Sequence, residues 1–111
     1  MNISKNLATN ILQQLKNIIN QDLNYINEDG TIIASTDPKR VGTFHAASVE
    51  CIKREKTIII ENDNEYIGSK KGINMPIYFD ESIIGVIGIT GDKKEVSKFG
   101  EIIRLMTSIL L

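Results

Sequence analysis

Positive charge gathers where a short helix is predicted to begin, in the segment "DPKRVGTFHAASVECIKREK" from Asp37 to Lys56. The first half of this segment contains Lys39, Arg40 and His45. A helix N-terminus exposes unpaired N–H groups and the positive end of the helix dipole, so Asp or Glu is favoured there. Because Arg40 offers a planar fork of donors that matches a carboxylate, the segment predicts a site for a carboxylate anion.

Two residues just before the helix extend this predicted anion site. Gly42 and Thr43 stand where the backbone N–H groups of a helix start are unpaired, and such groups bind anions. Thr43 can also cap the helix, which we expect over residues 44–54. The backbone donors of this segment are therefore expected to join Arg40 around the ligand.

His45 is the candidate second side chain of the site. Together with Val49 and Ile52 it falls at i, i+4 and i+7, which predicts that it points inward from the first turn. A protonated imidazole beside an anion would make binding depend on pH. A simpler alternative stays open, in which Asp37 pairs with Arg40 at the surface and His45 is a core histidine with satisfied hydrogen bonds.

The stretch "GINMPIYF" predicts a strand with one apolar face and one face that contains Asn74. The apolar face comprises Ile73, Met75, Ile77 and Phe79. If the following "DES" forms a three-residue turn, Asn74 lies opposite Gly88. The same register adds Ile83, Ile87 and Ile89 to the core.

Gly88 would then leave space in the middle of its strand, and polar groups would line that space. We expect these groups to be Asn74, the Thr90 hydroxyl and the N–H of Gly91. The alternative stays open that the glycines of "GVIGITG" relieve crowding or mark a bulge.

Other chemistries lack their signatures in this chain. The glycine-rich run has neither the GK[ST] ending nor the G-x-G-x-x-G spacing of a nucleotide site. Cys51 follows His45 by six residues, about 120° around a helix, so the two cannot pair as nucleophile and base. One His and the acidic "ENDNE" match neither a transition-metal nor a calcium site. We expect no cofactor, no metal ion and no catalytic residue, and Cys51 in the core.

The elements that position these residues follow from hydrophobic periodicity. An amphipathic helix is predicted over residues 4–20 with Ser4 as its N-cap, and its apolar positions are Ile3, Leu7, Ile11, Leu15 and Ile18. A hairpin is predicted over residues 23–35, around a turn in which Gly30 adopts a positive φ. Three more strands are expected at 57–61, 73–79 and 83–90. A closing helix from Lys93 has apolar positions at Val96, Phe99, Ile103, Met106 and Leu110.

This order predicts an α+β fold of the PAS-like sensor type, in one domain over residues 1–111. About five antiparallel strands form the sheet. The long N- and C-terminal helices are expected on one face, and the short helix with its loop is expected to cover the ligand side.

Composition narrows the classes of partner. The chain has 111 residues, 13 Lys+Arg against 14 Asp+Glu and one Cys, so it lacks the concentrated basic surface that nucleic acids require. No apolar run approaches the twenty residues of a membrane span, and the polar N-terminus does not read as a signal peptide. We therefore expect no membrane association and a cytoplasmic location.

Three blocks in order, "IIASTDPKRVGTFH", "GINMPIYFD" and "IIGVIGITGD", resemble the sugar-diacid recognition domain of carbohydrate diacid regulators. The resemblance covers nearly the whole chain. It implies an N-terminal sensor of a bacterial transcription regulator whose DNA-binding helix-turn-helix lies beyond this chain. It also implies a sugar diacid or a small hydroxy acid as ligand.

The resemblance carries over the family pattern R-[IV]-G-x-x-H onto Arg40 and His45, and the pattern G-[IV]-N-x-P onto Asn74 and Pro76. The family commonly has an acidic residue after the His, where this chain has Ala46. The residue patterns and the resemblance together predict a ligand site of Ser35, Asp37, Arg40, Gly42, Thr43, His45, Asn74, Pro76, Gly88, Thr90 and Gly91.

The sequence thus predicts a sensor that binds a small anionic sugar acid without turning it over. A homodimer formed by the terminal helices is expected, and DNA contact only through the region beyond this chain. The main alternative is a ligand-free dimerisation or protein-interaction module. A small enzyme that uses His45 as a general base is the weaker alternative, because no carboxylate or nucleophile accompanies this residue at a recognisable spacing.

Overall fold

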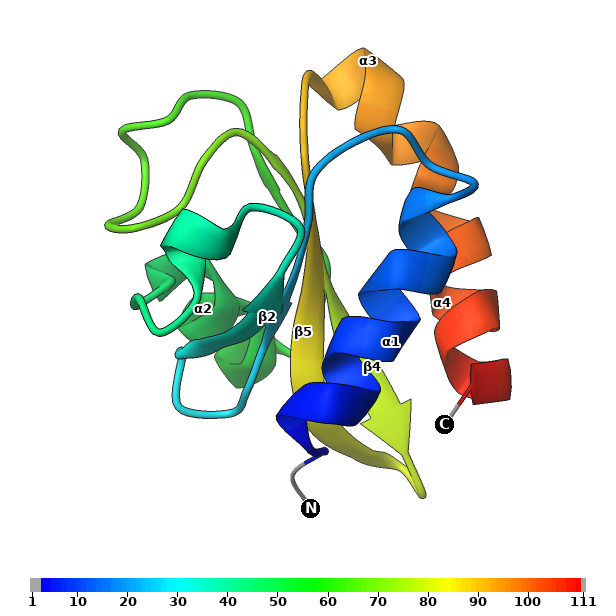
Figure 1. The fold of residues 1–111 in the computed structure, drawn as a ribbon. Coiled ribbons are helices and arrows are strands. Elements are labelled where there is room, and N and C mark those ends of the chain that lie inside the picture. The colour runs from blue at the N-terminus through cyan, green and yellow to red at the C-terminus, as the bar shows by residue number, and fades with distance from the viewer. Residues whose placement is uncertain (1–2, 111) are drawn as a thin grey trace.

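A single antiparallel sheet of five strands organises the chain (Figure 1). The computed structural model describes residues 3–110. The strands are β1 (Leu23–Ile26), β2 (Ile32–Ser35), β3 (Ile58–Ile60), β4 (Gly72–Phe79) and β5 (Ser82–Thr90). They lie in the order β2-β1-β5-β4-β3, and all four neighbouring pairs are antiparallel. The α+β class and the five-stranded antiparallel sheet are confirmed.

Helices cover both faces of this sheet (Figure 1). They are α1 (Lys5–Lys16), α2 (Ala46–Arg54), α3 (Lys93–Val96) and α4 (Gly100–Leu110), with short 3-10 helices η1 (Pro38–Arg40) and η2 (Ser97–Phe99). In Figure 1, α1 and α4 lie together on one face and α2 lies on the other. The segment between β2 and β3, which contains η1 and α2, therefore crosses from the sheet edge to the face opposite the terminal helices.

The first helix begins as predicted and ends earlier. Ser4 is its N-cap, with the hydroxyl oxygen accepting a hydrogen bond from the N–H of Leu7. Asn17 is the C-cap, so the chain leaves helical phase before Ile18, which is 57% exposed. Ile19 is fully buried in its place, and the prediction that Ile18 faces the core is wrong.

Two apolar clusters hold the helices on the sheet. The larger lies under α1 and α4 and includes Leu15, Leu23, Tyr25, Met75, Ile87 and Ile103. The smaller lies under α2 and comprises Ile26, Ile32, Ala47, Cys51, Ile58, Ile60 and Val86. Alternation along each strand sends successive side chains to these two clusters. The prediction for Leu110 concerns a side chain outside those that the structure describes.

The turn between β4 and β5 differs from the prediction, although the predicted register is correct. Two residues form the turn, Asp80 and Glu81, with φ of 49° and 66°, instead of the expected three. A two-residue turn alone would reverse the faces of β5. A β-bulge at Ile84 adds one residue to β5 and restores the parity, so Ile84 enters the core where Ile83 was expected.

We expect Glu81→Gly to stabilise the protein. Two consecutive residues with positive φ form a type I′ turn, in which glycine avoids a left-handed strain of roughly 1–2 kcal/mol, part of which its greater unfolded-state entropy offsets. Urea denaturation should show a gain of about 0.5–1 kcal/mol in the free energy of unfolding. Glu81→Ala is the matched control, because alanine keeps the strained φ. An equal gain from both variants would contradict this explanation.

Candidate functional site

A row of small and polar residues crosses the α2 side of the sheet. Ser35, Asn24, Gly88 and Asn74 are register neighbours on β2, β1, β5 and β4. Asn24 and Asn74 are 2% and 3% exposed. Gly88 therefore lies between two nearly buried carboxamides, which form the floor of the candidate site.

Asn74 explains why Gly88 has no side chain. A Cβ atom on Gly88 would lie 2.6 Å from Oδ1 of Asn74, which is too close for any real contact. The Nδ2 group of Asn74 donates to the carbonyl of Ile58 at 3.4 Å and holds the carboxamide over the glycine. The predicted pairing of Asn74 with Gly88 is confirmed, and close approach is the physical reason for this glycine.

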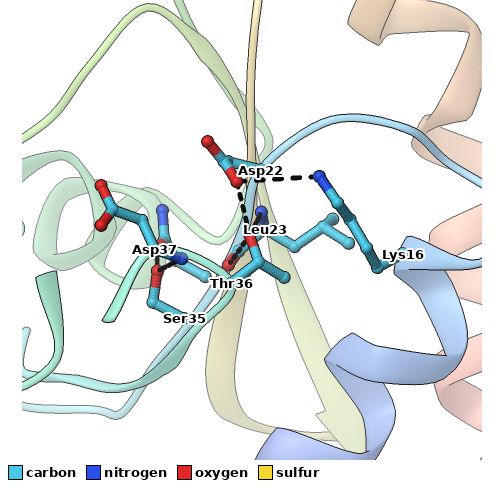
Figure 2. Close-up of polar contacts among 7 residues, drawn as sticks. Lys16, Asp22, Leu23, Ser35, Thr36 and Asp37 are labelled. Atoms are coloured by element: carbon cyan, nitrogen blue, oxygen red, sulfur yellow. Dashed lines mark hydrogen bonds and ion pairs between the residues drawn. The ribbon is translucent and has the colours of Figure 1, made fainter. Parts of the chain in front are cut away.

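Asn24 is a residue of the floor that the sequence analysis missed. Its Oδ1 accepts a hydrogen bond of 2.5 Å from the Ser35 hydroxyl, which itself accepts one from the N–H of Asp37. Figure 2 shows Ser35 and Asp37 side by side at this point. Asn24 alternates with Leu23 and Tyr25, which face the other cluster. A polar residue in the middle of a buried strand was the available signal.

His45 is buried, but its role differs from the predicted one. The helix begins two residues later than expected, with His45 as the N-cap in place of Thr43. Nδ1 accepts from the N–H of Ser48 at 3.3 Å and lies 2.7 Å from the Ser48 hydroxyl. An imidazole nitrogen that accepts from a backbone N–H carries no proton, so the neutral ring is protonated at Nε2. Burial, and then the charge of Arg40, lower the pKa of His45 to about 4.

The face that α2 presents to the sheet also differs from the prediction. Ala47, Ser48 and Cys51 are fully buried, whereas Val49 is 38% exposed. Small residues face inward because α2 packs closely on β4 and β5. The body of α2 thus rests on a filled apolar cluster, and the polar candidate site lies at its N-terminal end.

Arg40 is a partly buried cation without an ion pair. Nη2 donates to the carbonyl of Gly68 at 2.8 Å, and among the described residues no carboxylate lies within 4 Å of the guanidinium. Burial lowers the pKa of Arg40, and the charges of Asp37, Asp22 and Asp63 oppose this shift. Asp37 instead caps η1 by accepting from the N–H of Lys39. The alternative of a surface pair between Asp37 and Arg40 is therefore wrong.

The backbone N–H groups expected to bind an anion are already occupied. Those of Ala46 and Ala47, at the start of α2, donate to the Ile67 carbonyl and to the Ser69 hydroxyl. The further N–H groups of this prediction, in Gly42, Thr43 and Gly91, donate to carbonyls of Ile32, Arg40 and Lys71. These N–H groups are therefore not the free donors that the prediction required, because the protein's own carbonyl and hydroxyl groups already accept from them.

Pro76 and Thr90 are the remaining residues of the predicted ligand site. Pro76 lines a separate recess with residues of α4. Thr90 is half-buried, and its hydroxyl has no partner among the described residues. Cys51 is sealed in the apolar cluster, where burial raises the pKa of its thiol to about 12. Burial thus disfavours the thiolate, which is the reactive form of a cysteine.

An open groove of about 600 Å³ lies beside the floor, between α1 and the end of β2. Lys16 lines the groove and pairs with Asp22 at 3.7 Å. Figure 2 shows the Asp22 carboxylate between Lys16 and the Thr36 hydroxyl, which donates to it. Since this cation already has its anion, the groove fits an acid less well than Arg40 does.

Neither a cluster of metal-ligating side chains nor a membrane-spanning helix occurs among the residues that the structure describes. No three His, Cys, Asp or Glu side chains converge on a point that could hold a metal ion. None of the helices between residues 3 and 110 has the length and apolar content needed to cross a membrane.

Residues 3–111 match the protein family described as "Putative sugar diacid recognition". The chain belongs to this family. The resemblance inferred from the three sequence blocks is thereby confirmed.

Two longer proteins are similar to this chain in sequence. The chain is 37% identical over 107 residues to the uncharacterized protein YsfB of Bacillus subtilis strain 168, covering 95% of this chain and 29% of that protein. It is 28% identical over 107 residues to the carbohydrate diacid regulator of Escherichia coli strain K12, covering 95% and 28%. The chain thus spans less than a third of the length of these relatives.

Solved structures share the fold at low sequence identity. The GAF domain of an Acinetobacter phosphoenolpyruvate-protein phosphotransferase has a TM-score of 0.67 at 12% identity, covering 97% of this chain and 82% of that one. The sensor domain of the V. cholerae histidine kinase DctB has a TM-score of 0.61 at 19% identity, covering 85% and 40%. A free methionine-R-sulfoxide reductase of Neisseria meningitidis has 0.65 at 13%, covering 93% and 75%. These likenesses concern the fold alone.

We expect His45 to make stability fall in mild acid. Its pKa of about 4 in the folded protein lies below the 6.5 of the unfolded chain, so below pH 6.5 the unfolded state takes up the proton first. Between pH 6.5 and 4 the free energy of unfolding should decrease by up to roughly 3 kcal/mol from this residue. His45→Asn keeps a capping side chain and should show a shallower slope in urea titrations across this range. Parallel slopes for the two proteins would contradict a neutral His45.

Proposed function

We propose that this domain is a ligand sensor that binds a small anionic sugar acid, diacid or hydroxy acid without turning it over. One carboxylate of the acid lies against Arg40 and the Nε2–H of His45, at the N-terminal end of α2. The rest of the acid lies over the floor around Gly88. Helix α2, the loop before it and the loop before β4 thus form the ligand side of a PAS-like sensor.

The observation that carries this proposal is the unpaired charge of Arg40. A guanidinium withdrawn from water without a carboxylate loses solvation that a charge-assisted bidentate pair would replace. His45 supports it, since its side chain is 2% exposed and its Nε2–H has no acceptor among the described residues. Both donors complement a carboxylate, and family membership supports the same ligand class.

The absence of turnover is proposed from the chemistry of the same residues. A neutral His45 whose Nδ1 is occupied by Ser48 lacks the carboxylate partner that orients a catalytic histidine. Cys51 has a raised pKa and bonds to the backbone carbonyl of Asn74, so it does not supply a nucleophile. The reductase with the same fold does not alter this proposal, because its likeness extends only to the fold.

Signalling requires that the ligand contact two conformations unequally. In the structure Arg40 is bonded to the Gly68 carbonyl, and an acid that takes over the guanidinium would release this carbonyl and the loop that contains it. The ends of the loop connect to the start of the C-terminal helices through ion pairs of Lys71 with Asp92 at 2.8 Å and of Glu61 with Lys93 at 3.2 Å. Movement of the loop would thereby reach α3 and α4.

Arg40→Ala and Arg40→Lys should both weaken acid binding. Loss of a bidentate charged pair costs roughly 1.5–3 kcal/mol, and lysine does not reproduce the planar fork. Isothermal titration calorimetry with a panel of sugar acids measures this change, after thermal unfolding has shown that each variant is folded. Lys39→Ala is the matched control, because this neighbouring cation is exposed. Equal affinities of the wild type and both Arg40 variants would refute the assignment.

A homodimer is the second part of the proposal. The outer face of α4 exposes Ile102, Leu105 and Ile109 at i, i+3 and i+7, to 41%, 56% and 81%. Such an apolar row on a helix surface fits the same row of a second copy, which would bury it. A dimer through α4 would place the contact between two sensors at a helix that the loop movement would reach. DNA would be contacted through a helix-turn-helix region outside this chain.

The α4 row also supports the main alternative, a dimerisation module that binds no ligand. Leu105→Glu should weaken the dimer at least about tenfold, because it places a charge at the centre of the row. Light scattering coupled to size exclusion would show a fall from dimer to monomer mass, and Lys94→Glu, a charge change at an exposed site of α3, should leave the mass unchanged. A wild-type monomer at all concentrations would refute both the dimer and the alternative.

A further inference from the structure

The floor of the site presents a hydrogen-bond donor on one side of Gly88 and an acceptor on the other. On β1, Asn24 uses Oδ1 to accept from Ser35, and its Nδ2 group has no partner among the described residues. On β4, Asn74 uses Nδ2 to donate to the Ile58 carbonyl, and its Oδ1 has no partner. The two carboxamides therefore expose opposite ends toward Gly88.

The environment fixes both carboxamide orientations. The Ile58 carbonyl can only accept, so the group of Asn74 that faces it is the NH₂. The distance of 2.5 Å between the Ser35 hydroxyl and Asn24 is that of an O–H···O bond and is too short for an N–H···O bond, so the atom of Asn24 that faces Ser35 is Oδ1. Since Oδ1 and Nδ2 lie on opposite sides of Cγ, the bond to β2 directs the free donor of Asn24 away from that strand.

The two free atoms are accessible although their side chains are nearly buried. In the part of the chain that the structure describes, Thr107 Oγ1 is the sole side-chain nitrogen or oxygen that is sealed from solvent without a partner. The free atoms of Asn24 and Asn74 consequently keep contact with solvent. A buried carboxamide with one reachable, unpaired end is arranged to bond a group that enters from outside.

We propose that Asn24 and Asn74 together bind a hydroxyl group of the ligand over Gly88, which makes Asn24 a specificity-determining residue for hydroxy acids. A hydroxyl is both donor and acceptor, so it can accept from Nδ2 of Asn24 and donate to Oδ1 of Asn74. A carboxylate cannot donate to Oδ1, an ammonium cannot accept from Nδ2, and a methylene group does neither. Gly88 allows the Asn74 carboxamide to take this position, because a Cβ there would displace Oδ1 of Asn74. This inference rests on the proposed function.

Matched pairs of acids test the inference on the wild-type domain. Tartrate and succinate, glucarate and adipate, and glycerate and propanoate differ only in hydroxyl groups. A site built to bond a hydroxyl rejects the analogue that lacks it, so calorimetry should give at least a tenfold preference for the hydroxylated member of at least one pair. If every deoxy acid binds as tightly as its partner, the inference is overturned whatever the variants do.

Three variants locate the preference in the floor. Asn24→Ala and Asn74→Ala should bring the affinity ratio of the selected pair close to one while the deoxy acid binds as before. Gly88→Ala should do the same by moving the Asn74 carboxamide. Asn10→Ala, at an exposed position of α1, is the matched control and should keep the wild-type ratio. A full preference in folded Asn24→Ala would remove Asn24 from the site.

The same titrations separate this inference from the proposed function. Arg40→Lys should weaken both members of a pair alike and keep their ratio, because it removes a carboxylate contact. Equal, Arg40-dependent binding of hydroxy and deoxy acids would leave the sensor proposal intact and refute the hydroxyl floor. If none of the six acids binds the wild type, both are refuted.

Discussion

The candidate site depends on one register, in which β5 lies between β1 and β4 with Gly88 opposite both Asn24 and Asn74. A shift of one residue would turn both carboxamides toward the cluster under α1 and α4 and replace them by isoleucine or leucine. The register is secured by apolar residues on that far face, which alternate with the polar ones. The packing of the terminal helices therefore positions groups on the side of the sheet that they do not touch.

The second constraint is how the N-terminal end of α2 satisfies its own backbone. The loop before β4 supplies a carbonyl from Ile67 and a hydroxyl from Ser69 to the first N–H groups of the helix, and His45 caps it from within. Unpaired N–H groups would be costly in this partly buried place. Their closure leaves side chains as the free donors, and these differ in kind: a charged guanidinium, a neutral imidazole and a carboxamide. The proposed site would thus combine charge recognition at Arg40 with neutral recognition at the floor.

This division has a consequence for selectivity. Charge recognition at Arg40 would extend over several ångströms and would accept any acid that reaches it. Hydrogen bonding at a nearly buried carboxamide is short-ranged, and an unpaired partner is penalised. The proposed floor would therefore discriminate among acids that Arg40 alone would bind alike. Placing the two functions on different elements, a loop and the sheet, also lets the loop move while the floor stays rigid.

The sequence by itself determined the features that depend on neighbouring residues. Alternation predicted the faces of β4 from Ile73 to Ile77, but it was wrong for Phe79, which is 37% exposed beside the turn. Ser4 marked the start of α1 and Gly30 marked the first hairpin turn, because caps and turns are local. The sequence also identified Arg40 as a candidate cation for a carboxylate, although it left open that Asp37 pairs with Arg40. The tertiary structure decided what depends on distant segments: the acceptors of α2 come from a loop some twenty residues later, the bulge at Ile84 offsets a shorter turn, and Asn24 joins Asn74 only through β5. Such pairings are set by the packing of the whole chain, which local periodicity does not encode.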